Sequence, residues 1–278
     1  MPTITPDDNN QPHVAVQTAS ANGSVHLHGA TVTGWTPRGH EPVLWTSSKA
    51  VYDGQKAIRG GVPICTPWFG AHPTDDHAPA HGLARTALWT LDHAGVSEEE
   101  TLMGFGLELP GLKLTYGVLM GHTLKLVLDI TNLGEAERRV EAALHTYLAV
   151  SDARTIEITG LEQTGYLDKL TGPSHVPATG EPIQFTAETD RVYGDTDDVV
   201  VLHDPGLNRR INVAKDGGAS TIVWNPWIDK AAAMSDFGND EWTGMCCIES
   251  AAVGDDAWTI SPGETRTLTA EISVDTTD

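Results

Sequence analysis

Apolar and polar residues alternate with a period of two along much of this 278-residue chain. Segment 123–131 shows the pattern most clearly, because leucine or isoleucine occupies every second position. Side chains of a strand alternate between its two faces, so this segment is predicted to be a strand with one buried face. Strands of that kind are typical of antiparallel sheets stacked on one another.

The same reasoning predicts short strands from one end of the chain to the other. They cover 14–18, 24–28, 31–35, 43–45, 123–131, 140–150, 154–161, 220–224, 245–252, 259–260 and 265–274. Only 98–103 and 229–237 read as helices, and no repeat or linker divides the chain. We therefore predict an all-β fold, with a disordered lead-in over residues 1–12 and a single large antiparallel β-sandwich domain over residues 13–278.

The composition agrees with an all-β fold and also indicates where in the cell the protein is located. The chain is 40% apolar, which allows a substantial core, and its 28 glycines and 16 prolines suit many turns. No apolar run reaches the roughly 18 to 20 residues that cross a bilayer, and the N-terminal residues are polar and acidic. Three cysteines make a poor disulfide framework. A soluble cytoplasmic protein with reduced, buried thiols is expected.

The acidic composition argues against nucleic acids and anionic membranes as partners and raises the question of how an anionic substrate would bind. The chain carries 38 acidic against 17 basic residues, for a net charge of -21. Nucleic acids and anionic membranes require basic patches, so neither is expected as a partner. A field of this sign also repels an anionic substrate unless salt screens it. One hypothesis is that the protein is adapted to a salty interior.

Segment 58–85 places two of the few arginines among glycines and aromatic residues. It contains Ile58-Arg59-Gly60-Gly61-Val62-Pro63, Pro67-Trp68-Phe69-Gly70 and His81-Gly82-Leu83-Ala84-Arg85. Arginine makes forked, charge-assisted bonds to carboxylate or phosphate, and glycine lets the backbone approach a ligand. The segment is thus a candidate wall of an anion pocket, although a surface loop with ion-paired arginines would show the same sequence.

Two further segments offer proton-transfer groups. His145 and Tyr147 share one face of a predicted strand, where a histidine is more often simply a half-buried residue. Glu249 lies within the apolar run 245–252, where burial requires either a partner or a raised pKa. A raised pKa suits a general base near neutral pH. If one group takes a proton and the other gives one, the pair can open and close a cyclic hemiacetal without metal or organic cofactor.

Other motifs are weaker. Trp224 and Trp227 could form a platform for a sugar ring or simply anchor a loop. The histidines and aspartates of 72–81 read as a solvated surface rather than a metal site. No nucleophilic serine motif, phosphate-binding loop or dinucleotide fingerprint is present. We therefore expect no cofactor and no metal.

Taken in order, these motifs resemble a known family. They are the three stretches of 58–85, His145-Thr146-Tyr147, Gly160-Leu161, Tyr166-Leu167-Asp168-Lys169, Thr189-Asp190-Arg191-Val192-Tyr193, Trp224-Asn225-Pro226-Trp227 and Cys247-Ile248-Glu249. Their order resembles that of the hexose-6-phosphate mutarotases, or glucose-6-phosphate 1-epimerases, which are relatives of the aldose 1-epimerases. The likeness extends over about residues 25 to 270.

The resemblance implies a sandwich of the galactose mutarotase type that interconverts the α and β anomers of a hexose 6-phosphate. It implies that Glu249 is the base on the C1 hydroxyl and that His145 protonates the ring oxygen. Substrate-binding roles are implied for Arg59, Arg85, His81, Asp190, Trp224 and Asp168.

Two positions depart from the pattern of the family. Thr66 stands where a tryptophan is common, and Ala80 stands where some relatives have a polar residue, so the choice of sugar stays open.

The implied partner is a small-molecule sugar phosphate, bound by a monomer. Two alternatives stay open. The chain could be an aldose 1-epimerase for neutral sugars, or a non-catalytic carbohydrate-binding protein, because fold and motif do not decide the substrate.

Overall fold

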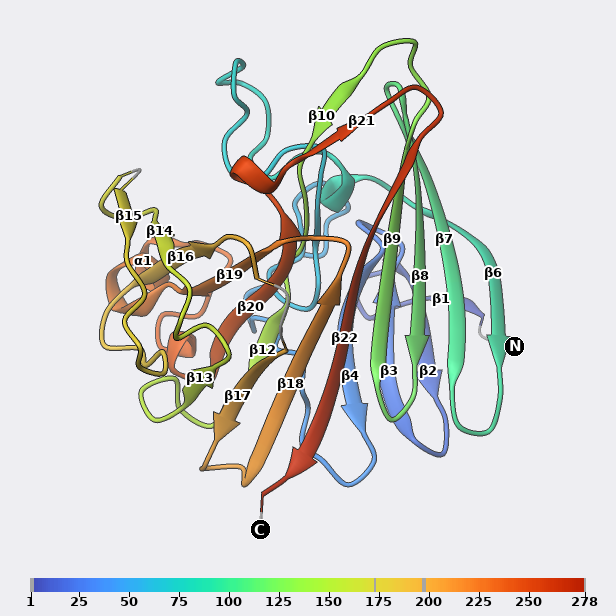
Figure 1. Ribbon diagram of the computed structural model, residues 1–278. Coiled ribbons are helices and arrows are strands. Elements are labelled where there is room, and N and C mark those ends of the chain that lie inside the picture. The colour runs from blue at the N-terminus through green and yellow to red at the C-terminus, as the bar shows by residue number, and fades with distance from the viewer. Residues whose placement is uncertain (1–2, 173, 197–198, 278) are drawn as a thin grey trace.

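Two antiparallel eight-stranded sheets form the body of the molecule in a computed structural model that describes residues 3–172, 174–196 and 199–277 (Figure 1). The sheet that carries the candidate site, here the site sheet, has the order β15 (Ser174–Val176), β14 (Tyr166–Asp168), β16 (Thr189–Tyr193), β19 (Ser220–Asn225), β20 (Met245–Ala252), β11 (Ala142–Leu144), β5 (Ile64–Cys65), with β12 (Tyr147–Ala149) also paired to β20. The other, the covering sheet, has the order β13 (Glu157–Thr159), β17 (Val200–Asp204), β18 (Arg209–Asp216), β22 (Thr265–Thr276), β9 (Leu124–Asn132), β8 (Leu112–Met120), β7 (Thr101–Leu109), β6 (Thr90–Val96).

Smaller elements complete the fold. A four-stranded sheet joins β1 (Ile4–Pro6), β2 (Pro12–Gln17), β3 (Ala21–His26) and β4 (Thr31–Pro37), and β10 (Arg138–Val140) pairs with β21 (Trp258–Ile260). The helical elements of the described residues are α1 (Trp227–Ala233) and the 3₁₀ turns η1 (Ala84–Thr86), η2 (Glu241–Gly244) and η3 (Gly254–Asp256). The prediction of an all-β fold of stacked antiparallel sheets is confirmed.

The core follows the alternation read from the sequence. Along β9, Leu124, Leu126, Leu128 and Ile130 are fully buried while the residues between them are partly or fully exposed. The main core also joins one face of β20 to β22, so the site sheet packs on the covering sheet. Each sheet thus buries one face in the shared core.

Neighbouring cysteines on β20 point to opposite faces of the site sheet. Cys246 belongs to the main core between the sheets, whereas Cys247 belongs to a smaller apolar cluster on the other face. Both are buried and unpaired, as is Cys65, which agrees with the expected reduced thiols. Among the described residues, no helix has the length and apolar character needed to span a membrane.

Two predicted elements are corrected. Residues 98–103 are not helical: Ser97 Oγ accepts bonds from the amides of Glu99 and Glu100 in the turn between β6 and β7, and Thr101 then begins β7. The run of glutamates suggested a helix, but the side chain of Ser97 stabilises a hairpin turn instead. The helix predicted over 229–237 exists, but it begins at Trp227 and ends at Ala233.

The N-terminal segment also differs from expectation. Residues 1–2 lie outside the described part, but residues 3–12 are not a free lead-in, because β1 pairs with β2. Asp7 accepts bonds from the amides of Asn9 and Gln11, and its Oδ2 lies within hydrogen-bonding distance, 3.2 Å, of Nε2 of the buried His26. A polar sequence is fixed here by local turn bonds and one side-chain contact rather than by apolar burial.

Candidate active site

A cavity of about 290 Å³ opens on the face of the site sheet that does not pack in the main core. It is lined by Arg59, Phe69, Ala80, His81, Arg85, His145, Tyr147, Lys169, Asp190, Trp224, Lys230, Met234 and Glu249. Every predicted site residue except Asp168 is in this lining. The structure therefore gathers residues that lie as much as 190 positions apart in the chain.

Strand register places His145 opposite Glu249. Leu144 pairs with Ser250 and Tyr147 pairs with Cys247, so the break between β11 and β12 leaves His145 directly across from Glu249. Side chains of opposed residues share a face and lie close together. The proximity of the two groups thus follows from the pairing of β20 with its neighbours.

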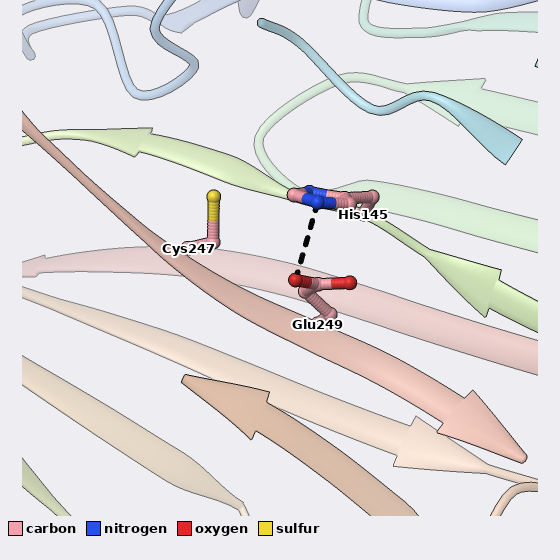
Figure 2. Close-up of side chains that lie close together, drawn as sticks. All are labelled: His145, Cys247 and Glu249. Atoms are coloured by element: carbon pink, nitrogen blue, oxygen red, sulfur yellow. Dashed lines mark ion pairs between the residues drawn. The ribbon is translucent and has the colours of Figure 1, made fainter. Parts of the chain in front are cut away.

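The two side chains meet at 3.4 Å, between His145 Nε2 and Glu249 Oε1 (Figure 2). Both are buried, with relative exposures of 8% and 1%. The remaining polar atoms, His145 Nδ1 and Glu249 Oε2, have no hydrogen-bond partner among the described residues. Groups that are buried yet unsatisfied are costly to keep, so they point to a functional role.

Burial shifts the protonation of this pair in opposite directions. Desolvation, reinforced by the charge of Asp190, raises the pKa of Glu249 well above its usual 4.5. Desolvation, reinforced by His81, Arg85 and Arg59, lowers the pKa of His145 well below its usual 6.5. The pair therefore tends to hold a single proton, and its two members lose and gain protons over separate pH ranges.

His81 presents a defined donor to the cavity. Its backbone has the left-handed φ of 62°, and the amide of Gly70 donates to its Nδ1 at 3.3 Å. Because that nitrogen accepts a bond, the proton of the neutral ring is on Nε2. Burial, followed by the charge of Arg85, lowers the pKa of His81 to about 3, which keeps the ring neutral.

Arg59 is held by Asp236 and Tyr147, a combination that the sequence analysis did not predict. Its Nε and Nη2 donate to Asp236 Oδ2 at 3.2 and 3.1 Å, and its Nη1 donates to the Tyr147 hydroxyl at 3.1 Å. The Tyr147 ring in turn stacks on His145 at 4.7 Å with an interplanar angle of 12°. Asp236 was missed because it is one acid among many in an acidic chain. Its contact with Arg59 depends on the path of the chain after α1.

The glycines beside Arg59 allow the loop to pack closely against the backbone of a neighbouring segment of the chain. At Gly60, with φ 121°, an added Cβ would lie 2.4 Å from Thr46 Cα and 2.5 Å from the Trp45 carbonyl oxygen. The expectation that glycine here brings backbone close to a ligand is therefore corrected. The loop is fastened to neighbouring strands: Tyr147 N donates to Gly61 O at 2.9 Å, and His145 N donates to Pro63 O at 3.0 Å.

Lys169, rather than Asp168, reaches the cavity. The amide of Lys169 bonds to the carbonyl oxygen of Asp190, and Asp168 pairs with Arg191 in register. Adjacent residues of a strand point to opposite faces, so Asp168 is on the other side of the sheet. Lys169 forms an ion pair of 3.3 Å with Asp190 and lies 5.0 Å from the Phe69 ring centroid. Asp168, predicted to bind the substrate, is thus outside the lining of the cavity.

Only one of the two predicted tryptophans faces the cavity. Trp224 contacts His145 and Tyr147 edge-on, at centroid distances of 6.2 and 6.0 Å. Trp227 instead packs on Trp242 at 4.2 Å and begins α1 with a φ of 56°. Trp227 thus anchors the helix that brings Lys230 and Met234 to the cavity wall.

Among the described residues, one group has the side chains and the spacing to hold a metal ion. The ligand atoms of His145, Cys247 and Glu249 all lie within 4.8 Å of one another (Figure 2). The His-rich stretch 72–81 forms no such group among the described residues.

Comparison with known proteins agrees with the fold and identifies the family. Residues 13–273 match the family model described as aldose 1-epimerase. A protein of Cenchrus ciliaris, named as a proposed glucose-6-phosphate 1-epimerase, is 33% identical over 259 residues, covering 86% of this chain and 77% of the relative.

Solved structures show the same fold. The crystal structure of a proposed mutarotase from Salmonella typhimurium superposes with a TM-score of 0.91 at 26% identity, covering 99% of this chain and 96% of the other. A galactose mutarotase-like protein of Clostridium acetobutylicum has a TM-score of 0.73 at 12% identity, covering 99% of each chain, and shows the shared fold alone. With a family match over nearly its whole length, this chain belongs to the aldose 1-epimerase family of isomerases.

Proposed function

We propose that this mutarotase acts on a hexose 6-phosphate, with glucose 6-phosphate favoured. The observation that carries the proposal is the charge of the cavity wall. Four cationic side chains, Arg59, Arg85, Lys169 and Lys230, line a cavity in a protein whose net charge is -21. Cations gathered against the charge of the whole molecule favour an anionic ligand.

Arg85 is the strongest candidate for a contact with the phosphate. Its Nη2 donates to the Ala80 carbonyl oxygen at 2.7 Å, its buried Nε has no partner, and it forms no ion pair within the described residues. The other three cations have carboxylate partners: Asp236 for Arg59, Asp190 for Lys169, and Glu188 at 3.9 Å for Lys230. The charge of Arg85 is thus the one that a substrate anion would balance.

The ion pairs of these cations with carboxylates keep open the alternative of an epimerase for neutral sugars. Three of the four cations already have carboxylate partners, as they could in an epimerase for neutral sugars. That reading predicts equal action on glucose and glucose 6-phosphate.

The proposed chemistry uses the pair that meets at 3.4 Å. Burial places the single proton of the pair on Glu249 at rest, so the reaction begins when that proton moves to His145. The Glu249 carboxylate then takes the proton of the C1 hydroxyl while protonated His145 gives a proton to the ring oxygen, and the ring opens. Rotation about the C1–C2 bond presents the other face of the carbonyl. The neutral His145 then takes back the C5 hydroxyl proton while Glu249 returns its proton to the carbonyl oxygen. One proton stays with the pair in total, so every step balances.

The direct test is the relaxation of freshly dissolved α-glucose 6-phosphate and of α-glucose, with and without the protein, in high salt. We expect acceleration of the phosphorylated sugar over the spontaneous rate, and little effect on glucose. Equal acceleration of both sugars would establish the neutral-sugar alternative. No acceleration of either would refute an active mutarotase.

Two neighbouring residues provide a matched pair of variants for the charge argument. Lys169→Met should raise KM for glucose 6-phosphate about tenfold, because a charged contact is worth on the order of 1.5 kcal/mol or more. Asp168→Asn, on the opposite face of the sheet, should leave KM near the wild-type value. Arg85→Ala should raise KM at least as much as Lys169→Met, without a comparable effect on glucose.

A further inference from the structure

We propose that His145 and Glu249, which line the cavity, form a reversible inhibitory site for Zn²⁺ together with the buried Cys247 beside them. The three side chains supply one nitrogen, one sulfur and one oxygen ligand. Zn²⁺ accepts this mixture, whereas Mg²⁺ and Ca²⁺ require oxygen ligands. Nothing in the proposed epimerase chemistry uses Cys247.

The spacing of the atoms fits a tetrahedral ion. Zinc bonds of about 2.0 to 2.2 Å to nitrogen and oxygen set those two ligands roughly 3.3 to 3.6 Å apart. His145 Nε2 and Glu249 Oε1 are 3.4 Å apart. The group as a whole lies within 4.8 Å, so the Cys247 sulfur reaches its position with a small side-chain movement.

The backbone holds the three ligands on one face. Cys247 and Glu249 are two positions apart on β20, and His145 lies across from Glu249 in register. Figure 2 shows the three side chains close together, with Cys247 to one side of the His145–Glu249 pair. A metal would therefore not require the strands to move.

Apart from the contact between them, His145 and Glu249 have no side-chain hydrogen bonds among the described residues that a metal would have to break. Glu249 Oε2 and His145 Nδ1 are buried and lack partners among the described residues. Since both residues also line the cavity, a water molecule or another small ligand can complete the coordination.

The charge balance also permits the ion. When Zn²⁺ binds, Glu249 and Cys247 each give up a proton to solvent, and the resulting carboxylate and thiolate neutralise the ion. Of the nearby cations, Arg59 and Lys169 are already balanced by Asp236 and Asp190, which leaves Arg85 as the uncompensated positive charge that opposes the ion. A bound ion ties up both proton-transfer groups, so inhibition should compete with the sugar.

The test combines activity and direct binding. Micromolar ZnCl₂ should slow mutarotation by the wild-type protein, a chelator should restore it, and MgCl₂ should have no effect. Cys247→Ala should keep its activity in the absence of metal, while its inhibition constant for Zn²⁺ rises at least about tenfold, since even an outer-sphere partner is worth that much. Cys246→Ala, which alters the neighbouring thiol on the opposite face, should be inhibited like the wild type.

The inhibition experiment rests on the proposed function, because it requires an active mutarotase. A direct measurement of metal binding tests the metal site without that assumption. Co²⁺ in place of Zn²⁺ should give a thiolate charge-transfer band with wild-type protein and with Cys246→Ala, but not with Cys247→Ala, whatever the enzyme's substrate. Absence of that band from the wild type, or its persistence in Cys247→Ala, would overturn the site. Equal zinc inhibition of both cysteine variants would overturn it as well.

Discussion

The opposite pKa shifts of Glu249 and His145 predict how the rate depends on pH. A pair with ordinary values of 4.5 and 6.5 would lose its single proton as the pH rises through 6.5. Here burial raises the pKa of Glu249 and lowers that of His145. The one-proton state therefore persists upward through neutrality and ends only above the raised pKa of Glu249, while a second proton is added only below the lowered pKa of His145.

The expected profile of kcat/KM against pH is flat through 6.5 and falls on the alkaline side. The negative charge of Asp190 is part of what raises the Glu249 pKa, so Asp190→Asn should move the alkaline limb to lower pH. The measurement is the rate of anomer exchange across a pH series for both proteins. A wild-type profile that declines through 6.5, or a limb that does not move in the variant, would contradict the assignment.

At this scale the sequence was informative about residues whose type is unusual for their surroundings. A glutamate in an apolar strand and arginines in an acidic chain were recognisable, and the cavity contains Glu249, Arg59 and Arg85. The sequence was misleading about Asp168. Adjacent residues of a strand face opposite sides of the sheet, so a shift of one residue decides whether Asp168 or Lys169 faces the site. Which of the two does so depends on pairing with β16, which no local pattern reveals.

At the scale of elements, the loop that carries Arg59 depends on close backbone contacts. Gly60→Ala would place a methyl group against the backbone of Thr46 and Trp45 at a positive φ. The conformational cost of about 1 to 2 kcal/mol and the overpacking cost of about 1 to 3 kcal/mol should together lower the free energy of unfolding by about 2 to 5 kcal/mol. Urea unfolding followed by circular dichroism measures it.

A second glycine supplies the control for that change. Gly39 also has a positive φ, of 85°, but an added Cβ would meet nothing within 4 Å. Gly39→Ala should therefore show the conformational cost alone. If both variants lost the same stability, the packing of the Gly60 backbone would not matter as described.

The strand β9, with one buried face, was predicted from its alternation, but β8, which has the same burial pattern, was not among the predicted strands. Element types were not predictable where a side chain bonds to nearby backbone. Residues 98–103 read as a helix by composition, yet the bonds to Ser97 Oγ make the turn before β7. The same kind of local bonding, from Asp7, orders the polar N-terminal segment.

For the whole molecule, the net charge of -21 implies self-repulsion that salt relieves. If the protein is adapted to high salt, its Tm should rise as KCl is added. The rise should be steepest below about 1 M, because at about 1 M the screening length has already fallen to about 3 Å and further salt screens little more. Thermal unfolding in a KCl series tests this. A Tm that is unchanged between low and high salt would count against salt adaptation.

Overall architecture was the most predictable level. Period-two patterning and frequent turns indicated stacked antiparallel sheets, because burying one face of each strand leaves few other arrangements. The order of pairing within the sheets was not predictable from these patterns, since strands far apart in sequence, such as β5 and β11, lie side by side. That order decides which residues meet in the cavity.

The backbone bonds that join the Arg59 loop to His145 and Tyr147 bear on how the enzyme handles its two products. These bonds tie the backbone of the loop directly to the segment that carries the proposed proton-transfer histidine. Under the proposed function, the anion-binding arginine and that histidine are positioned by one connected stretch of backbone. We therefore expect the α and the β anomer to meet the same arrangement of the two groups.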